Sequence, residues 1–99
     1  MATVQCFPIA TEITEELGTL QNIPNIQAVY SKWYDQTYVV WIGILHDDAT
    51  ARKAVYQLED RISNIFKSVL FDFNVIALPD GKKTEDYVSN AERVFQHNA

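Results

Sequence analysis

This 99-residue sequence has little of several residue types, and each shortage excludes a class of protein. It has one cysteine, Cys6, so no internal disulfide framework can form, and we expect a cytoplasmic protein. The longest apolar run near its middle, Tyr38–Leu45, is far shorter than the roughly 20 residues of a membrane-spanning helix. No basic residue precedes an apolar stretch in Met1–Ala10, so we expect no secretory signal.

Basic residues and glycines are also scarce. Eight lysines and arginines against 13 acidic residues give a net charge of −5, which disfavours binding to nucleic acid or to an anionic membrane. The three glycines are isolated, which excludes a phosphate-binding loop and a dinucleotide fingerprint. We therefore expect no cofactor, and no set of residues points to an enzyme. The length fits a single domain, residues 1–99.

Two segments have the apolar spacing of helices. Isoleucines and leucines spaced by three or four residues predict a first helix over residues 8–21, ended by Asn22 and Pro24. The clearer pattern predicts a second helix over residues 49–67. Asp48 precedes it, and its carboxylate can accept the free amide protons of the first turn.

Three segments rich in valine, isoleucine and aromatic residues predict strands. Ile26–Tyr34 and Thr37–His46 form a hairpin around Asp35-Gln36, each strand carrying one of the two tryptophans. If Tyr34 pairs with Thr37, Trp33 lies opposite Tyr38. A third strand, Val69–Leu78, ends at the turn Pro79-Asp80-Gly81. The tail offers a helical turn near Thr84–Val88 and a short strand, Glu92–Gln96.

The order α-β-β-α-β, with a weak C-terminal strand, predicts a two-layer α+β sandwich. The crossover through the second helix makes the strands on either side of it parallel. This arrangement is related to a ferredoxin-like sandwich without its first strand. The tail strand is a candidate for the vacant place, which the sequence does not fix.

We expect the helices to cover one sheet face, leaving the other without a cover because no segment is long enough. That second face carries a largely aromatic and aliphatic set: Tyr30, Tyr34, Trp41, Leu45, Leu70, Ile76 and Leu78. Apolar patches of this kind mark partner or ligand surfaces. The favoured function is therefore an interaction module that forms a homodimer through this face. The candidate interface or ligand residues are Tyr30, Tyr34, Trp41, Asp72 and Asn74.

The alternative is a small-molecule-binding regulatory domain, in which Tyr30, Trp41, Asp72 and Asn74 line a pocket. An enzyme ranks third, because one carboxylate and one amide do not define a reaction. His46, followed by two aspartates, is a weak metal candidate, and a turn with a helix cap explains the same residues better. Cys6 precedes the first helix, and a buried small apolar residue is the commoner role for such a cysteine.

The run Phe71-Asp72-Phe73-Asn74-Val75-Ile76, followed after a turn by Ser89-Asn90-Ala91-Glu92, resembles a group of small bacterial proteins. In that group, which has no known activity, a charged helix precedes an Asp-Phe-x-Val-Ile strand. The resemblance covers the C-terminal half. It implies a bacterial origin and a small α+β fold, and it transfers no functional residue.

Overall fold

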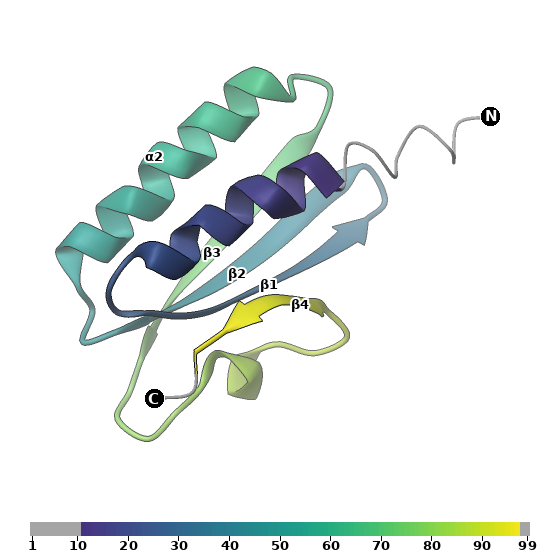
Figure 1. The fold of residues 1–99 in the computed structure, drawn as a ribbon. Coiled ribbons are helices and arrows are strands. Elements are labelled where there is room, and N and C mark those ends of the chain that lie inside the picture. Colours follow the sequence, from purple (N-terminus) through teal and green to yellow (C-terminus); the bar gives the residue numbers. More distant parts are fainter. Residues whose placement is uncertain (1–10, 98–99) are drawn as a thin grey trace.

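The computed structural model describes residues 11–97, and Figure 1 shows two helices lying across one face of a sheet. Residues 11–18 are helical. The elements that follow are η1 (Thr19–Asn22), β1 (Ile26–Tyr34), β2 (Thr37–Leu45), α2 (Ala49–Ile65), β3 (Leu70–Leu78), η2 (Thr84–Tyr87) and β4 (Glu92–Gln96). The predicted α+β class is confirmed, and the predicted bounds of β1 and β4 are those observed. Within the described range, no helix is both long and apolar enough to cross a membrane.

The four strands lie in the order β3-β2-β1-β4, and β2 and β3 are parallel neighbours. A ferredoxin-like sheet has a split β-α-β unit, in which another strand separates the two strands joined by the helix. No strand separates β2 from β3, so the expected vacant place does not exist. The tail strand β4 pairs instead with the outer side of β1. Along the chain, the helices and strands follow the order α-β-β-α-β-β.

The hairpin has the predicted register. Tyr34 pairs with Thr37 and Trp33 with Tyr38, whose rings lie 4.9 Å apart. Asp35 allows the tight connection by adopting a left-handed φ of +59°, a conformation that aspartate tolerates better than most residues. Because side chains alternate along a strand, this register fixes which residues face the helices.

The core lies between the helices and the sheet. Its sheet side consists of alternating residues of β1 and β2, including Val29, Val40, Ile42 and Ile44, all fully buried. The helices contribute the apolar stripes predicted from their spacing: Ile13, Leu17, Leu20, Ala51, Val55, Leu58 and Ile62. Trp33, Phe71, Phe73 and Val75 are partly buried against this cluster. The prediction that both helices cover this one face is confirmed.

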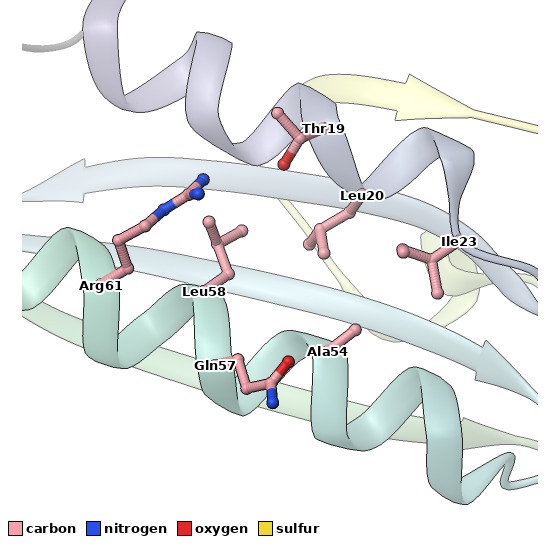
Figure 2. Close-up of a pocket in the computed structure, with 7 residues that line it drawn as sticks. All are labelled: Thr19, Leu20, Ile23, Ala54, Gln57, Leu58 and Arg61. Atoms are coloured by element: carbon pink, nitrogen blue, oxygen red, sulfur yellow. The ribbon is translucent and has the colours of Figure 1, made fainter.

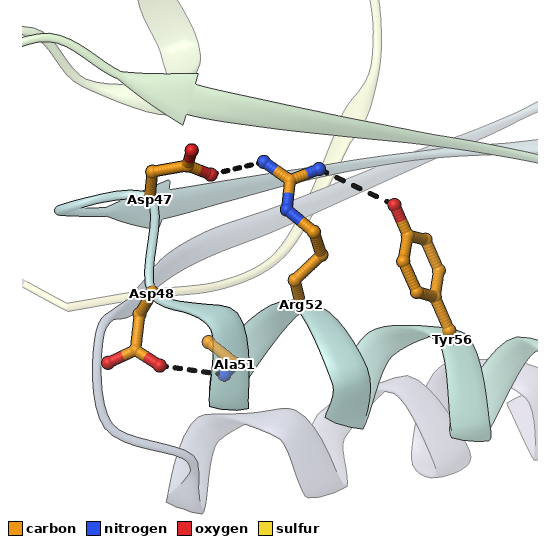
Figure 3. Close-up of polar contacts among 5 residues, drawn as sticks. All are labelled: Asp47, Asp48, Ala51, Arg52 and Tyr56. Atoms are coloured by element: carbon orange, nitrogen blue, oxygen red, sulfur yellow. Dashed lines mark hydrogen bonds and ion pairs between the residues drawn. The ribbon is translucent and has the colours of Figure 1, made fainter.

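The start of α2 is fixed by Asp48, as predicted. Its Oδ1 accepts a hydrogen bond from the Ala51 amide at 3.0 Å, and its Oδ2 accepts one from Asn25 Nδ2 at 2.7 Å. Beside it, Asp47 forms an ion pair with Arg52, which also donates to the Tyr56 hydroxyl (Figure 3). The two hydrogen bonds to Asp48 lower the pKa of its carboxyl, the bond from the Ala51 amide being the largest cause and the bond from Asn25 the next.

We predict that Asp48→Ala lowers the melting temperature at neutral pH and that Asp48→Asn lowers it less, since asparagine also caps helices. Because the native pKa of Asp48 lies below its ordinary value, its stabilisation is complete above that value and is lost as pH falls through the native pKa. The difference from the wild type should therefore shrink in acid. Thermal unfolding over a pH series checks this, with exposed Asp80→Ala as control. A difference that persists unchanged in acid would contradict the capping role.

Candidate interaction surface

The sheet face opposite the helices, called the open face below, is partly covered. After β3 the chain turns beneath the sheet, and η2 lies on the side away from the helices (Figure 1). Thr84 of η2 is fully buried, and a Cβ added to Gly43 of β2 would lie 1.8 Å from its Oγ1. The expectation that no segment is long enough to cover this face is therefore wrong for the part of the sheet around Gly43, which η2 covers.

Gln27 holds the covering segment in place. Its Oε1 accepts hydrogen bonds from the Thr84 amide at 3.0 Å and from the Thr84 hydroxyl at 2.6 Å. Its Nε2 donates to the carbonyl of His97 at 3.2 Å. The pairing of β1 with β2 shifts between Ile26 and Ala28, so Gln27 is an extra residue in the strand. Such a bulge redirects a side chain, and here a single buried glutamine in β1 contacts both η2 and His97, the residue that follows β4.

Tyr30, one of the predicted interface residues, is beneath this cover. It is only 8% exposed. Burial raises the pKa of its hydroxyl, and the nearby carboxylate of Glu85 in η2 raises it further, while Arg93 of β4 acts in the opposite direction. Ala28, Gly43 and Leu78 are also buried on this half of the sheet. Tyr30 is therefore buried within the molecule and does not belong to the candidate surface.

The rest of the open face, towards the Asp35-Gln36 turn and along β3 as far as Ile76, is exposed. Tyr34 is 68% exposed and Leu70 is 64% exposed, while Val39, Trp41 and Ile76 are partly exposed. These five residues share the open face, because β1–β2 and β2–β3 are paired in register along it. We call them the uncovered patch. Two of the predicted interface residues, Tyr34 and Trp41, belong to it.

The remaining two predicted residues, Asp72 and Asn74, lie in β3 beside the uncovered patch. Asp72 is adjacent to Val39 in the register and is exposed, and Asn74 is adjacent to Trp41 and is half-buried. Asn74 Nδ2 donates to the carbonyls of Val40 at 3.3 Å and Asp72 at 3.4 Å. These distances are longer than those of the usual hydrogen bond, so the amide NH2 group is able to donate to a closer acceptor.

The weak metal candidate is accounted for by the turn before α2. His46 and Asp47 have left-handed φ values of +60° and +45° and are exposed, and Asp48 caps the helix. Across residues 11–97, no three histidine, cysteine or acidic side chains are grouped so that they could hold a metal ion. Cys6 lies outside the described residues.

Three cavities open on the surface, each in a different place. One of about 270 Å³ lies between the two helices, lined by Leu20, Ala54 and Leu58, with Arg61 at its edge (Figure 2). A second, of about 460 Å³, lies near His97, and a third, of about 350 Å³, lies beside Trp33. None of the three is lined by Tyr30, Trp41, Asp72 or Asn74. The pocket that the alternative function requires is therefore not one of them.

The structure adds Gln27, Gly43 and Thr84 to the residues that shape this surface. One signal in the sequence pointed to Gly43, because a glycine inside a strand often marks the close approach of another part of the chain. No local pattern indicated that Thr84, 41 residues further on, is that part.

Comparison of the chain with protein-family models, with curated proteins and with solved structures finds no match.

Proposed function

We propose that this protein is an interaction module that forms a homodimer by packing the uncovered patch against the same patch of a second copy. The observation that carries the proposal is the exposure of Tyr34 and Leu70 beside partly exposed Val39, Trp41 and Ile76. Aromatic residues dominate the energetics of interfaces because each removes a large apolar area from water. A cytoplasmic setting, expected from the single cysteine, and a bacterial origin, implied by the resemblance, are part of the proposal.

Charge complementarity supports a second copy as the partner. Lys32, Val39 and Asp72 form one row across the sheet, with the cation on one side of the patch and the carboxylate on the other. A two-fold axis that runs along β2 between two stacked sheets exchanges the ends of this row. Lys32 of each copy then lies over Asp72 of the other. An isologous interface requires this kind of self-complementarity.

The test is Trp41→Glu, which places a charge in the centre of the uncovered patch. We expect the dissociation constant to rise at least about 30-fold, since a central tryptophan contributes about 2 kcal/mol or more to an interface. Sedimentation velocity over a concentration series measures this. A wild-type protein that remains a monomer at tens of micromolar would contradict the proposal.

Two further variants separate a loss of association from a loss of folding. Tyr34→Glu alters a side chain that is already mostly exposed, so the fold should tolerate it while the dimer weakens. Ile65→Glu adds the same charge to an exposed apolar residue of α2, on the helix side of the molecule. It should leave association unchanged, whereas equal weakening by both variants would indicate a nonspecific effect.

The alternative, a small-molecule-binding regulatory domain, has less support. It required Tyr30, Trp41, Asp72 and Asn74 to line one pocket, whereas Tyr30 is buried under η2 and Asp72 is exposed on a strand. A thermal-shift screen with metabolites and nucleotides addresses it directly, because a bound ligand raises the melting temperature by mass action.

A further inference from the structure

The two edges of the sheet differ in ways that matter for pairing with another strand. The β4 edge is five residues long, contains Glu92 and Arg93, and is irregular, because its pairing with β1 shifts between Val29 and Tyr30. These are the features by which proteins protect an edge from pairing. The β3 edge is nine residues long and pairs with β2 without any shift in register. It contains no proline, glycine, lysine or arginine, and no strand within residues 11–97 pairs with its other side.

The sequence of this free edge is self-complementary. In an antiparallel pair of β3 strands centred on Phe73, Leu70 lies opposite Ile76 and Phe71 opposite Val75. Asp72 lies opposite Asn74, and Phe73 lies opposite its own copy. Each apolar residue thus meets an apolar residue, and each polar residue meets a polar one. Shifting the centre to Asp72 would place two carboxylates opposite each other, which destabilises a strand pair.

We propose that the β3 edge pairs with the β3 edge of a second copy in this register, joining two four-stranded sheets into one of eight strands. A two-fold axis perpendicular to the sheet reverses the strand and keeps all the helices on the same face, so residues that face each other come from the same face in both copies. Asn74 Nδ2, whose two hydrogen bonds within its own chain are long, donates to the Asp72 carboxylate of the second copy.

This edge interface is distinct from the face-to-face interface of the proposed function. Edge pairing uses the backbone groups of β3, whereas face packing uses side chains of the uncovered patch. Trp41→Glu should disrupt face packing and leave edge pairing intact.

The test uses complementary charges at the polar pair, in a Trp41→Glu background that removes face packing. Asn74→Asp places carboxylates opposite carboxylates at two positions, and Asp72→Lys with Asn74→Lys places ammonium groups opposite ammonium groups. We expect each variant alone to dimerise at least about fivefold more weakly than its background, from the size of cross-strand charge effects. An equimolar mixture should recover a heterodimer at least as tight as the background dimer. Native mass spectrometry distinguishes these species.

The matched control is a mixture of Ala77→Asp and Ala77→Lys, at an exposed position on the same strand. In the proposed register Ala77 lies opposite Val69, four residues from the centre, so the two introduced charges are far apart and mixing should add nothing. A heterodimer that fails to form in the first mixture, or that exceeds its statistical share equally in the control, would overturn the proposal.

Hydrogen exchange on the unaltered protein provides a second test that needs no variant to fold. The β3 amides directed away from β2 should exchange several-fold more slowly as the protein concentration is raised, because pairing covers them. Exchange at these amides that is independent of concentration would overturn edge pairing, whatever the outcome for Trp41→Glu.

Discussion

Gly43→Ala should destabilise the folded protein by about 3 kcal/mol, the upper part of the range for an overpacked site. The added Cβ would lie 1.8 Å from Thr84 Oγ1, 2.9 Å from Thr84 Cβ and 3.0 Å from Leu78 Cδ1. Thr84 cannot move aside easily, because its hydroxyl and its amide are both bonded to Gln27. We therefore expect η2 to be displaced from the sheet, and urea denaturation measures the loss.

A double-mutant cycle identifies the cause of that loss. Thr84→Gly removes both Thr84 atoms that the new Cβ would meet, so Gly43→Ala should cost much less in that background. The matched control is Gly18→Ala, where an added Cβ meets nothing within 4 Å. Gly18 has an ordinary helical φ of −61°, so alanine should stabilise the protein by up to about 1 kcal/mol. Additive effects of Gly43→Ala and Thr84→Gly would contradict the close approach of η2.

Gln27→Leu should destabilise the protein by about 2–4 kcal/mol. The leucine keeps the volume of the side chain and leaves the buried hydroxyl and amide of Thr84 without an acceptor, each at a cost of about 1–3 kcal/mol. Adding Thr84→Val removes the hydroxyl and should recover its share of the loss, while the amide remains unpaired. Chemical denaturation of the single and double variants separates the two contributions.

The control for this prediction is Gln57→Leu, at an exposed position of α2. It should change the free energy of unfolding by less than about 0.5 kcal/mol. If Gln27→Leu is as mild as Gln57→Leu, then Gln27 does not hold the covering segment, and the division of the open face into a covered and an uncovered half loses its basis.

The sequence predicted the parts of this fold that local chemistry determines. The alternation in β1 and β2, together with the tight turn at Asp35, was enough to give the register that places Trp33 in the core and Trp41 on the open face. The carboxylate of Asp48 ahead of an apolar stripe was enough to give the start of α2. Both features depend on residues that are close together in the chain. The first follows from the alternation of side chains along a strand, and the second follows from helix capping.

The covering of the open face depends instead on residues far apart in the chain. Gln27 and Thr84 are 57 residues apart, and neither has a pattern in its own neighbourhood that indicates the other. Thr84–Tyr87 was predicted as a helical turn, but its place on the sheet follows from the absence of a side chain at Gly43. For the same reason Tyr30 was predicted at the interface, whereas it lies beneath η2.

The order of the strands in the sheet also could not be predicted from local sequence patterns. The crossover through α2 determined that β2 and β3 are parallel, but parallel strands can be neighbours or can be separated by another strand. Local patterns do not distinguish these arrangements, because β4 could have paired with either β1 or β3. The structure shows β4 on the outer side of β1, and none of the strands in the described part of the chain pairs with the β3 edge.

The central claim, that the uncovered half of the open face associates with a second copy, is tested most directly by the two tryptophan indole signals in an ¹H–¹⁵N spectrum. Trp41 lies in the uncovered patch, whereas the Nε1 atom of Trp33 is buried on the helix side of the sheet. On dilution through tens of micromolar, we expect the Trp41 signal to shift and the Trp33 signal to stay in place. Two signals that do not change with concentration would contradict the account.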